Sequence, residues 1–342
     1  MQKIRTLLWP FSLIYGSVTY FRNKLFDLGI LSIYVLPNKS ICVGNLSTGG
    51  TGKTPHVAYL TALLSGKMET AILSRGYGRK TRGFLLISEQ NTASEAGDEP
   101  LFYKHSFGET VHVAVCENRK IGAQKIQQLF PKNELIILDD AFQHRKIKAG
   151  MNILLTDYNS PFSKDFVLPA GNLREFKSGK NRADIFIVTK CPPKLSEGQK
   201  SKLAKTLKVN PEVLFFSSIR YAPFQSFGKI VSQPTHIVLV TGIANPNGLV
   251  EKLSEKYTVE HLKYKDHHSF SMEEIEQIHQ KFDTFAYSNA IILTTEKDFM
   301  RLKDFDTAEN FNAYPWYYQP ITVEIENEIQ FKETINQYVN TI

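Results

Sequence analysis

Residues Gly49 to Thr54 read Gly-Gly-Thr-Gly-Lys-Thr, a spacing of glycine, lysine and hydroxyl side chains that suits a bound phosphate. The run follows the strand-like residues 40–43 and precedes a helix-compatible run, which is the order of strand, loop and helix that a P-loop requires. Glycines let main-chain N–H groups turn toward phosphates, and the start of the helix adds the positive end of its dipole. The nucleotide-binding residues expected here are Thr48, Gly49, Gly50, Thr51, Gly52, Lys53 and Thr54.

Two of these residues have separate expected tasks. Lys53 would neutralise the β- and γ-phosphates of a nucleotide, and Thr54 would ligate Mg²⁺. The full P-loop pattern wants a further glycine at position 47, where this chain has Ser47, so the strict pattern fails by one residue. The alternative interpretation is a glycine-rich turn that binds no nucleotide.

A second acidic element supports the nucleotide hypothesis. The apolar run 135–138 leads directly into Asp139 and Asp140, as expected of a strand that ends beside the metal of a P-loop enzyme. Adjacent side chains on a strand point to opposite faces, so one carboxylate would reach the metal or its water while the other orients a neighbour. The sequence leaves open which aspartate does which.

The order of apolar runs predicts an α/β fold, with a P-loop NTPase-type, mostly parallel sheet domain and a second, smaller α/β lobe. Seven strands are expected in the first series, at 41–43, 71–73, 111–115, 135–138, 153–156, 185–189 and 214–217. A second series contains strands at 237–241 and 290–295 and a helix at 271–283. The predicted boundaries are an amino-terminal apolar, basic helix region at 1–36, the P-loop domain at 37–220, a linker or hinge at 221–234 and the smaller lobe at 235–342.

The amino-terminal segment is apolar, aromatic and basic from about Leu7 to Tyr34. Pro10, Arg22 and Asp27 interrupt what would need to be about 20 apolar residues to span a bilayer. The segment therefore suits lying in a membrane interface better than crossing it, and the alternative is a helix packed on the protein core.

The amino-acid composition restricts the possible classes of binding partner only slightly. The formal net charge of +7 favours an anionic partner, but the basic residues are scattered and no nucleic-acid-binding module is visible, so no nucleic-acid partner is expected. The three cysteines do not form a C-x-x-C pair, which argues against a disulfide framework or a zinc site. No obligate protein partner is evident, and the oligomeric state is left open.

Several further motifs occur in a recognisable order. They are Leu73-Ser74-Arg75-Gly76-Tyr77-Gly78-Arg79, Gly97-Asp98-Glu99-Pro100, Asp139-Asp140-Ala141-Phe142-Gln143-His144, Pro169-Ala170-Gly171-Asn172-Leu173-Arg174-Glu175, Asp266-His267-His268 and Thr295-Glu296-Lys297-Asp298. Together with the glycine loop, this set resembles the tetraacyldisaccharide 4′-kinase family, whose members phosphorylate the lipid A precursor. The resemblance extends from the amino-terminal apolar segment to about Lys303, and the imperfect glycine loop is shared with that family.

The resemblance implies two lobes joined by a hinge, with ATP and Mg²⁺ bound to the larger lobe and the smaller lobe closing over them. It implies a glycolipid substrate, a tetraacylated disaccharide 1-phosphate that receives phosphate on its 4′-hydroxyl. It also implies peripheral attachment at the cytoplasmic face of the inner membrane. The alternative is a soluble P-loop kinase or NTPase that acts on a small cytosolic molecule, which would not need the apolar, basic amino terminus.

Family resemblance also suggests site residues. Asp98 is expected to be the catalytic base, paired with His267 or, as the open alternative, His268, because a sugar hydroxyl needs a positioned group to accept its proton. Asp98 could instead cap a helix that begins at Glu99-Pro100. The expected metal environment is Thr54, Asp139, Asp140 and Glu175, and the expected phosphate- or substrate-neutralising cations are Arg75, Arg79, Arg119 and Arg174. Residues 295–298 receive no role.

Overall fold

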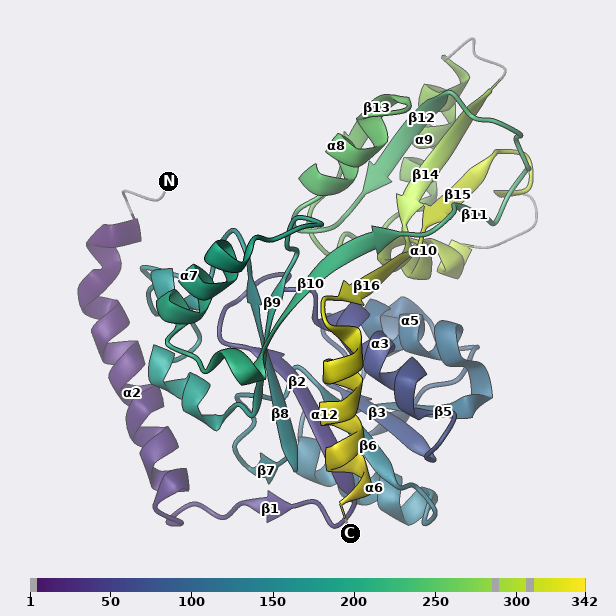
Figure 1. Cartoon of the computed structure of the whole chain (residues 1–342). Helices are drawn as coiled ribbons and strands as arrows, with labels where there is room; N and C mark the ends of the chain where they lie inside the picture. The colour runs from purple at the N-terminus through teal and green to yellow at the C-terminus, as the bar shows by residue number, and fades with distance from the viewer. Residues whose placement is uncertain (1–4, 285–288, 306–310, 342) are drawn as a thin grey trace.

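The computed structural model describes residues 5–284, 289–305 and 311–341, which form a larger and a smaller lobe (Figure 1). The larger lobe is built on a nine-stranded sheet and the smaller lobe on a five-stranded sheet, and most neighbouring strands in both sheets run parallel. The predicted fold class, α/β with a mostly parallel main sheet and a second, smaller α/β lobe, is confirmed.

The nine-stranded sheet places the glycine loop near its centre, because the strand before the loop, β2, lies between β8 and β6. Only the edge strands β16 and β4 run antiparallel to their neighbours. In spatial order the strands are β16 (Ile321–Ile325), β10 (Leu214–Tyr221), β9 (Ile185–Thr189), β8 (Met151–Asp157), β2 (Lys39–Asn45), β6 (Leu135–Asp139), β3 (Thr70–Ser74), β5 (Val111–Val115) and β4 (Leu85–Leu86). A separate parallel pair joins β1 (Tyr34–Val35) to β7 (Ile147–Lys148).

Both faces of this sheet are buried, and the alternation of side chains along β2 shows how. Ile41 and Val43 enter one apolar core, while Cys42 between them enters the other. The first core is covered by α3 (Lys53–Leu64), α5 (Asp98–Phe107) and α12 (Glu328–Asn340), and the second by α6 (Arg119–Leu129) and α7 (Glu197–Leu207). The remaining short helices of this lobe are α4 (Ala93–Ala96) and the 3₁₀ turns η2 (Gly108–Thr110), η3 (Phe162–Lys164), η4 (Lys177–Arg182) and η5 (Pro211–Val213).

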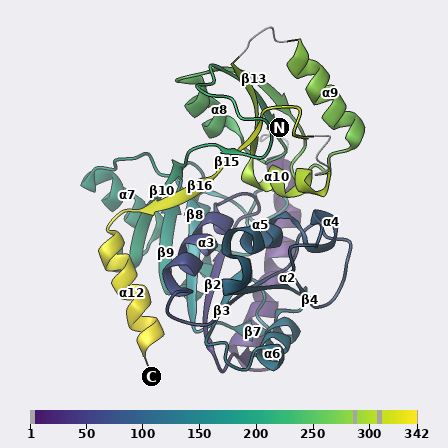
Figure 2. The same cartoon turned by 90° about the vertical axis from the view of Figure 1, so that its right-hand side faces the viewer.

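The smaller lobe repeats the same layering on a smaller scale. Its strand order is β11 (Gln225–Ser226), β15 (Trp316–Gln319), β14 (Ala290–Thr295), β12 (His236–Thr241) and β13 (Thr258–Lys263). The helix α8 (Asn247–Ser254) covers one face and α9 (Met272–Asp283) the other, because their buried residues belong to different apolar clusters. The last elements of this lobe are α10 (Glu296–Leu302) and η6 (Lys303–Phe305), and Figure 2 shows α10 beside α5 of the larger lobe.

The chain passes between the lobes twice. The first passage follows β10 at residues 222–224, and the second is at Pro320, between β15 in the small sheet and β16 in the large one. The sequence-based boundary that gave 235–342 to the smaller lobe is therefore wrong for its last segment. Residues 321–341 return to the larger lobe, where β16 pairs with β10 and α12 buries Phe331 and Ile335. A short amphipathic segment does not show in its sequence which sheet it will join.

The amino-terminal helix α2 (Trp9–Asp27), preceded by η1 (Thr6–Leu8), lies along the side of the larger lobe (Figure 1). Its buried residues are mostly small and polar, namely Ser12, Gly16 and Thr19, together with Phe26. Gly16 lies against the ring of Phe176 so closely that a Cβ there would overlap it. The helix thus docks through its small side chains and leaves its large apolar ones outside.

Candidate active site

The glycine loop has the backbone shape that a phosphate cradle needs. Gly49 and Gly52 adopt φ values of 105° and 83°, a region that side-chain-bearing residues rarely enter. A Cβ at Gly49 or Gly50 would meet no atom within 4 Å, so the main chain there faces open space. Because α3 begins at Lys53, the free N–H groups of its first turn point toward the same space.

Neighbouring loops hold this backbone in place. The main-chain N–H of Thr48 donates to the carbonyl of Asn172 at 2.7 Å. Lys190 donates to the carbonyl of Gly50 at 2.5 Å, and the hydroxyl of Thr189 donates to the carbonyl of Thr51 at 2.9 Å. The loop is therefore held by Asn172, which belongs to the Pro169–Glu175 motif, and by two residues at the end of β9 that belong to no recognised motif.

The two aspartates at the end of β6 diverge, as expected from their position. Asp140 has φ 47°, a strained conformation for a residue with a side chain, and its carboxylate accepts two bonds from Arg174, at 2.9 and 3.2 Å. Lys53 lies 3.7 Å from the same carboxylate. Although burial opposes it, Lys53 and Arg174 hold the pKa of Asp140 below its usual value. Asp140 thus orients the two cations that face the phosphate loop.

Asp139 is buried in a different way. Its Oδ2 accepts a hydrogen bond from Tyr103 at 3.1 Å, whereas its Oδ1 is buried and has no hydrogen-bond partner. Burial, together with the nearby Glu99 and Asp140 carboxylates, raises the pKa of Asp139 to about 7. A buried carboxylate oxygen without a partner is costly unless a cation binds it.

Glu99 was not among the expected metal ligands, yet it is the carboxylate that contacts the loop. The Thr54 hydroxyl donates to its Oε1 at 2.8 Å, and Lys297 of the smaller lobe donates to the same oxygen at 2.5 Å. The Gly-Asp-Glu-Pro motif contained this residue, but two acidic neighbours in one helical turn gave no sign of which one would face the P-loop.

These residues fit a magnesium ion. Thr54 and Glu99 are hydrogen-bonded hard oxygen ligands, the Asp139 carboxylate lies near Glu99 with its Oδ1 unpartnered, and Mg²⁺ is usually held by one or two carboxylates with substrate phosphates and water completing its shell. Within the described ranges, no three His, Cys, Asp or Glu side chains come close enough to enclose a metal on their own. A site that depends on the nucleotide's phosphates accounts for both observations.

Asp98 and His267 are brought together across the two lobes. His267 Nδ1 lies 3.1 Å from Asp98 Oδ2, and His267 has φ 55°, so its ring is presented from a strained turn. His268 turns away and lies 2.9 Å from Glu274. The geometry therefore pairs His267, rather than His268, with Asp98.

The Asp98 carboxylate is also held by Arg301, whose second nitrogen contacts Asp298 at 2.7 Å. Burial alone would raise the pKa of Asp98, but His267, Lys297 and Arg301 together hold it well below the usual range. The hydrogen bond to Asp98 raises the pKa of His267. With Nδ1 bound to the carboxylate, Nε2 of the imidazole is the atom able to accept a proton.

Two of the four expected arginines are already occupied by protein. Arg79 pairs with Glu117 at 2.7 Å, and the buried Arg119 donates to the carbonyls of Cys116 and Asp139 at 2.8 and 3.0 Å. Burial lowers the pKa of Arg119 to about 10. These two side chains shape the ends of β5 and β6, whereas Arg174 reaches the site through Asp140 and Arg75 is exposed.

The structure places Glu175 away from the expected metal environment. Both of its oxygens are bound by Arg182, at 2.7 and 3.0 Å, and Gln143 and Asn23 donate to them at 3.1 and 2.7 Å. Asn23 belongs to α2, so the buried Glu175 carboxylate connects the amino-terminal helix to the larger lobe. A glutamate beside Arg174 in the sequence could not be distinguished from a metal ligand without these contacts.

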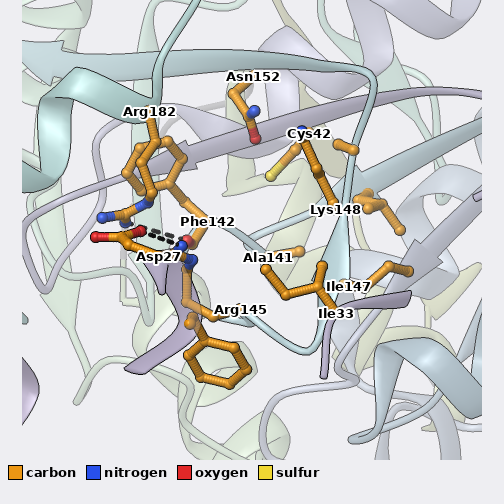
Figure 3. Close-up of a pocket in the computed structure, with 13 residues that line it drawn as sticks. Asp27, Ile33, Cys42, Ala141, Phe142, Arg145, Ile147, Lys148, Asn152 and Arg182 are labelled. Carbon is orange, nitrogen blue, oxygen red and sulfur yellow. Dashed lines mark hydrogen bonds and ion pairs between the residues drawn. The ribbon is translucent and has the colours of Figure 1, made fainter. Parts of the chain in front are cut away.

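Two cavities lie under the carboxyl end of α2 and share Phe26, Arg145 and Ile147. One, of about 350 Å³, is drawn in Figure 3, where the Asp27–Arg145 ion pair of 2.7 Å lies beside Phe142 and Arg182. The other, of about 370 Å³, is strongly basic. Its charged and polar lining comprises one acidic residue, Glu117, together with Arg22, Asn118, Arg119, Lys120, Gln143, His144, Arg145 and Lys146. The glycine loop lines neither cavity.

A cradle for phosphate oxygens next to an imidazole that can take a proton from a hydroxyl is suited to moving a phosphoryl group onto an alcohol. The fold and the site thus define a P-loop phosphotransferase.

Comparisons with known proteins agree with this class. A family model described as tetraacyldisaccharide-1-P 4′-kinase matches residues 4–340. Proteins named tetraacyldisaccharide 4′-kinase are 42% identical in Cytophaga hutchinsonii, over 99% of this chain and 95% of the relative, and 43% identical in Flavobacterium psychrophilum, over 100% and 98%. The crystal structure of LpxK from Aquifex aeolicus in complex with ATP matches with a TM-score of 0.76 at 30% identity, covering 98% of this chain and 99% of that one. The chain belongs to the tetraacyldisaccharide 4′-kinase family, which confirms the relation predicted from its motifs.

Proposed function

We propose that this enzyme transfers the γ-phosphoryl group of ATP, with Mg²⁺, to the 4′-hydroxyl of a tetraacylated disaccharide 1-phosphate at the cytoplasmic face of the inner membrane. One observation carries the proposal most directly. The His267–Asp98 pair lies one residue from Glu99, which is hydrogen-bonded to Thr54 of the phosphate loop. This arrangement supports a role for the pair as proton acceptor beside the terminal phosphate.

In this proposal His267, rather than Asp98, accepts the proton. Asp98 is held as a carboxylate by Arg301 and His267, which makes it a weak base near neutral pH, whereas its contact strengthens the imidazole. As Nε2 of His267 takes the proton, the 4′-oxygen bonds to the γ-phosphorus, the bond to the bridging β–γ oxygen breaks, and ADP leaves. Thr54, Asp139 and Glu99 would hold Mg²⁺, which would neutralise phosphate charge. Lys53 would bind the phosphates directly.

The basic cavity suits the anionic end of such an acceptor. Lys120 and Lys146 line it next to Arg119 and His144, beyond the end of β6 where the aspartate pair also lies. Burial and the adjacent arginines lower the pKa of His144 to about 4, so its ring is a neutral hydrogen-bonding group there. A phosphate monoester that enters this cavity would meet lysine ammonium groups near its rim.

The outer face of α2 supports attachment to a lipid surface. Phe11, Ile14, Val18 and Phe21 are exposed, Ile14 by 64% and Phe21 by 65%, and Arg22 and Lys24 follow them. No helix of the described ranges is long and apolar enough to cross a bilayer. An apolar face flanked by basic residues binds in the interface of an anionic membrane, where the headgroups attract the cations.

The activity test is incubation with γ-labelled ATP and a panel of acceptors in detergent micelles, with the His267→Ala variant as control. We expect label on the tetraacylated disaccharide 1-phosphate and at least about a hundredfold less with the variant. Faster labelling of a small, water-soluble alcohol would instead support a soluble kinase and overturn the substrate assignment.

The membrane test is flotation with vesicles that contain anionic phospholipid. We expect wild-type protein to float and the Phe11→Ser/Ile14→Ser/Phe21→Ser variant to remain at the bottom, with unchanged ATP affinity. The matched control is Ile230→Ser, which removes an exposed apolar side chain between β11 and β12 of the smaller lobe and should leave flotation intact. Equal flotation of the wild type and the triple variant would refute attachment through α2.

A further inference from the structure

Lys297 is a cation of the smaller lobe that reaches the phosphate site of the larger lobe. It belongs to the Thr295-Glu296-Lys297-Asp298 motif, for which the sequence suggested no role. Its Nζ lies 2.5 Å from Glu99 Oε1, the oxygen that also accepts the Thr54 hydroxyl. One carboxylate oxygen is therefore shared by a P-loop hydroxyl and an ammonium from the opposite lobe.

The surrounding charges explain why an ammonium lies at this point. Glu99, Asp98 and Asp139 each stabilise the charged form of Lys297 and raise its pKa against the effect of burial. The neighbouring carboxylates have other cations in contact, because Asp98 pairs with Arg301 and Asp140 with Lys53. Lys297 is thus the side chain that neutralises Glu99, next to the unpartnered Asp139 oxygen.

The helix that carries Lys297 is held firmly against the larger lobe. The Thr295 side chain caps α10 by accepting from the Asp298 N–H at 3.2 Å. Phe299 and Met300 of α10 enter the apolar core that includes α3 and α5, and Figures 1 and 2 both show α10 next to α5. The packing of α10 on the larger lobe therefore fixes where the main chain of Lys297 lies, while its side chain can still change direction.

We propose that Lys297 takes the place of the metal ion at Glu99 when no nucleotide is bound, and contacts the transferred phosphoryl group once MgATP occupies the site. The inference rests on the phosphate site proposed above and assigns a catalytic residue to the smaller lobe.

The physical reason is that a divalent cation and an ammonium cannot share one carboxylate oxygen at close range without strong repulsion. The ion would have two further oxygen ligands near Glu99, the Thr54 hydroxyl and the Asp139 carboxylate, so the ammonium is the group that moves. The nearest new anion is the terminal phosphate, whose charge spreads over its outer oxygens in the transition state. A cation from the opposite lobe would stabilise that charge only when the lobes are closed.

The first test measures Mn²⁺ binding without nucleotide or acceptor, by the loss of the free-ion electron paramagnetic resonance signal. We expect Lys297→Met to bind Mn²⁺ at least about tenfold more tightly than wild type, because the ammonium no longer competes for Glu99. Lys303→Met is the control, since Lys303 is exposed six residues further along the chain, at the start of η6, and it should match wild type. Equal Mn²⁺ affinity in wild type and Lys297→Met would overturn the proposal that Lys297 takes the place of the metal ion at Glu99.

The second test compares kcat with ATP affinity. Lys297→Met should lower kcat at least about a hundredfold, while the dissociation constant of MgATP changes less than about threefold. Lys297→Arg retains the charge and should keep at least about a tenth of wild-type kcat, which also separates loss of the cation from loss of folding. A kcat of Lys297→Met within about threefold of wild type would overturn the contact with the phosphoryl group. Because Mn²⁺ binding needs no acceptor, its outcome is independent of whether the proposed glycolipid is the true substrate.

Discussion

The two lobes contribute to the site in different ways. The larger lobe contributes the glycine loop, which includes Lys53 and Thr54, and the acidic residues at the end of the neighbouring strand β6. The smaller lobe supplies isolated side chains, His267 and Arg301, which meet Asp98 only because the lobes are closed. In the proposed function, the larger lobe binds the nucleotide while the smaller lobe provides proton transfer and charge. Changes in the larger lobe should therefore weaken ATP binding, whereas changes in the smaller lobe should slow turnover of bound ATP.

The largest effect is expected from Lys53→Ala, which removes the cation of the phosphate loop. Turnover should fall at least about a hundredfold, and the affinity for ATP should fall at least about tenfold, because Lys53 contacts the nucleotide before and during reaction. Fluorescent-nucleotide titration and labelled-phosphate transfer measure the two quantities. Lys67→Ala, just beyond the end of α3, is the matched control. Unchanged ATP affinity in Lys53→Ala would contradict the assignment of ATP binding to the larger lobe.

His267→Ala should come next, with turnover lowered about 10²–10⁴-fold, as is usual for loss of a general base. Its affinity for ATP should stay within about threefold of wild type, because the imidazole faces the acceptor rather than the loop. His268→Ala should have a smaller effect, since that ring contacts Glu274. If the two variants lost similar activity, the pairing of His267 with Asp98 would have no special role.

A smaller effect, on pH dependence, is expected from Asp98→Asn. His267 must be neutral to accept a proton, so the rate should rise with pH through its pKa, which Asp98 raises. Removing the carboxylate charge lowers that pKa, so the acid limb of kcat/KM should move to lower pH, together with a lower maximum rate. An acid limb that stays in place would contradict the assignment of the base to His267.

The smallest effect is expected from Asn23→Ala at the interface between α2 and the larger lobe. This variant removes one hydrogen bond to the buried Glu175 and should reduce the free energy of unfolding by about 1–2 kcal/mol. Turnover on bound ATP should change little. Thermal unfolding measures the loss, and Ser17→Ala on the exposed side of α2 is the control. A large loss of turnover without loss of stability would show that α2 belongs to the chemistry rather than to the attachment.

Much of the larger lobe could be predicted from sequence because its determinants are local. All seven expected strands of the first series overlap observed strands, two of them, 111–115 and 185–189, with the same bounds. Buried parallel strands are continuous apolar runs, and a strand followed by glycines and a helix defines its own geometry. The shared strand order also places Asp139 beside the loop, since β2 and β6 are neighbours.

The features that could not be predicted from sequence depend on contacts between segments that are distant in the chain. Glu99 and Lys297 are 198 residues apart, and nothing near either residue reveals that they meet. Glu175 and Arg119 have residue types that suit a metal and a phosphate, but burial against Arg182 and main-chain carbonyls gives them structural contacts. The strand β13 was missed because it is half-exposed and mixes charged with apolar residues. The residue type shows which chemical roles a side chain can have. The residues that it contacts in the folded protein decide which of these roles it takes.

The double passage of the chain between lobes means that the larger lobe cannot be excised as one continuous fragment, although the smaller lobe is continuous from residue 225 to residue 319. A piece that begins at residue 235 and runs to the carboxyl terminus would carry β16 and α12 without the sheet that buries them. A truncation after Gln319 would uncover the edge of β10 and invite edge-to-edge aggregation. Genetic dissection of this enzyme therefore has to be done by substitution or by inserting a linker in place of residues 225–319, which would bring the two flanking strands of the hinge into a single hairpin.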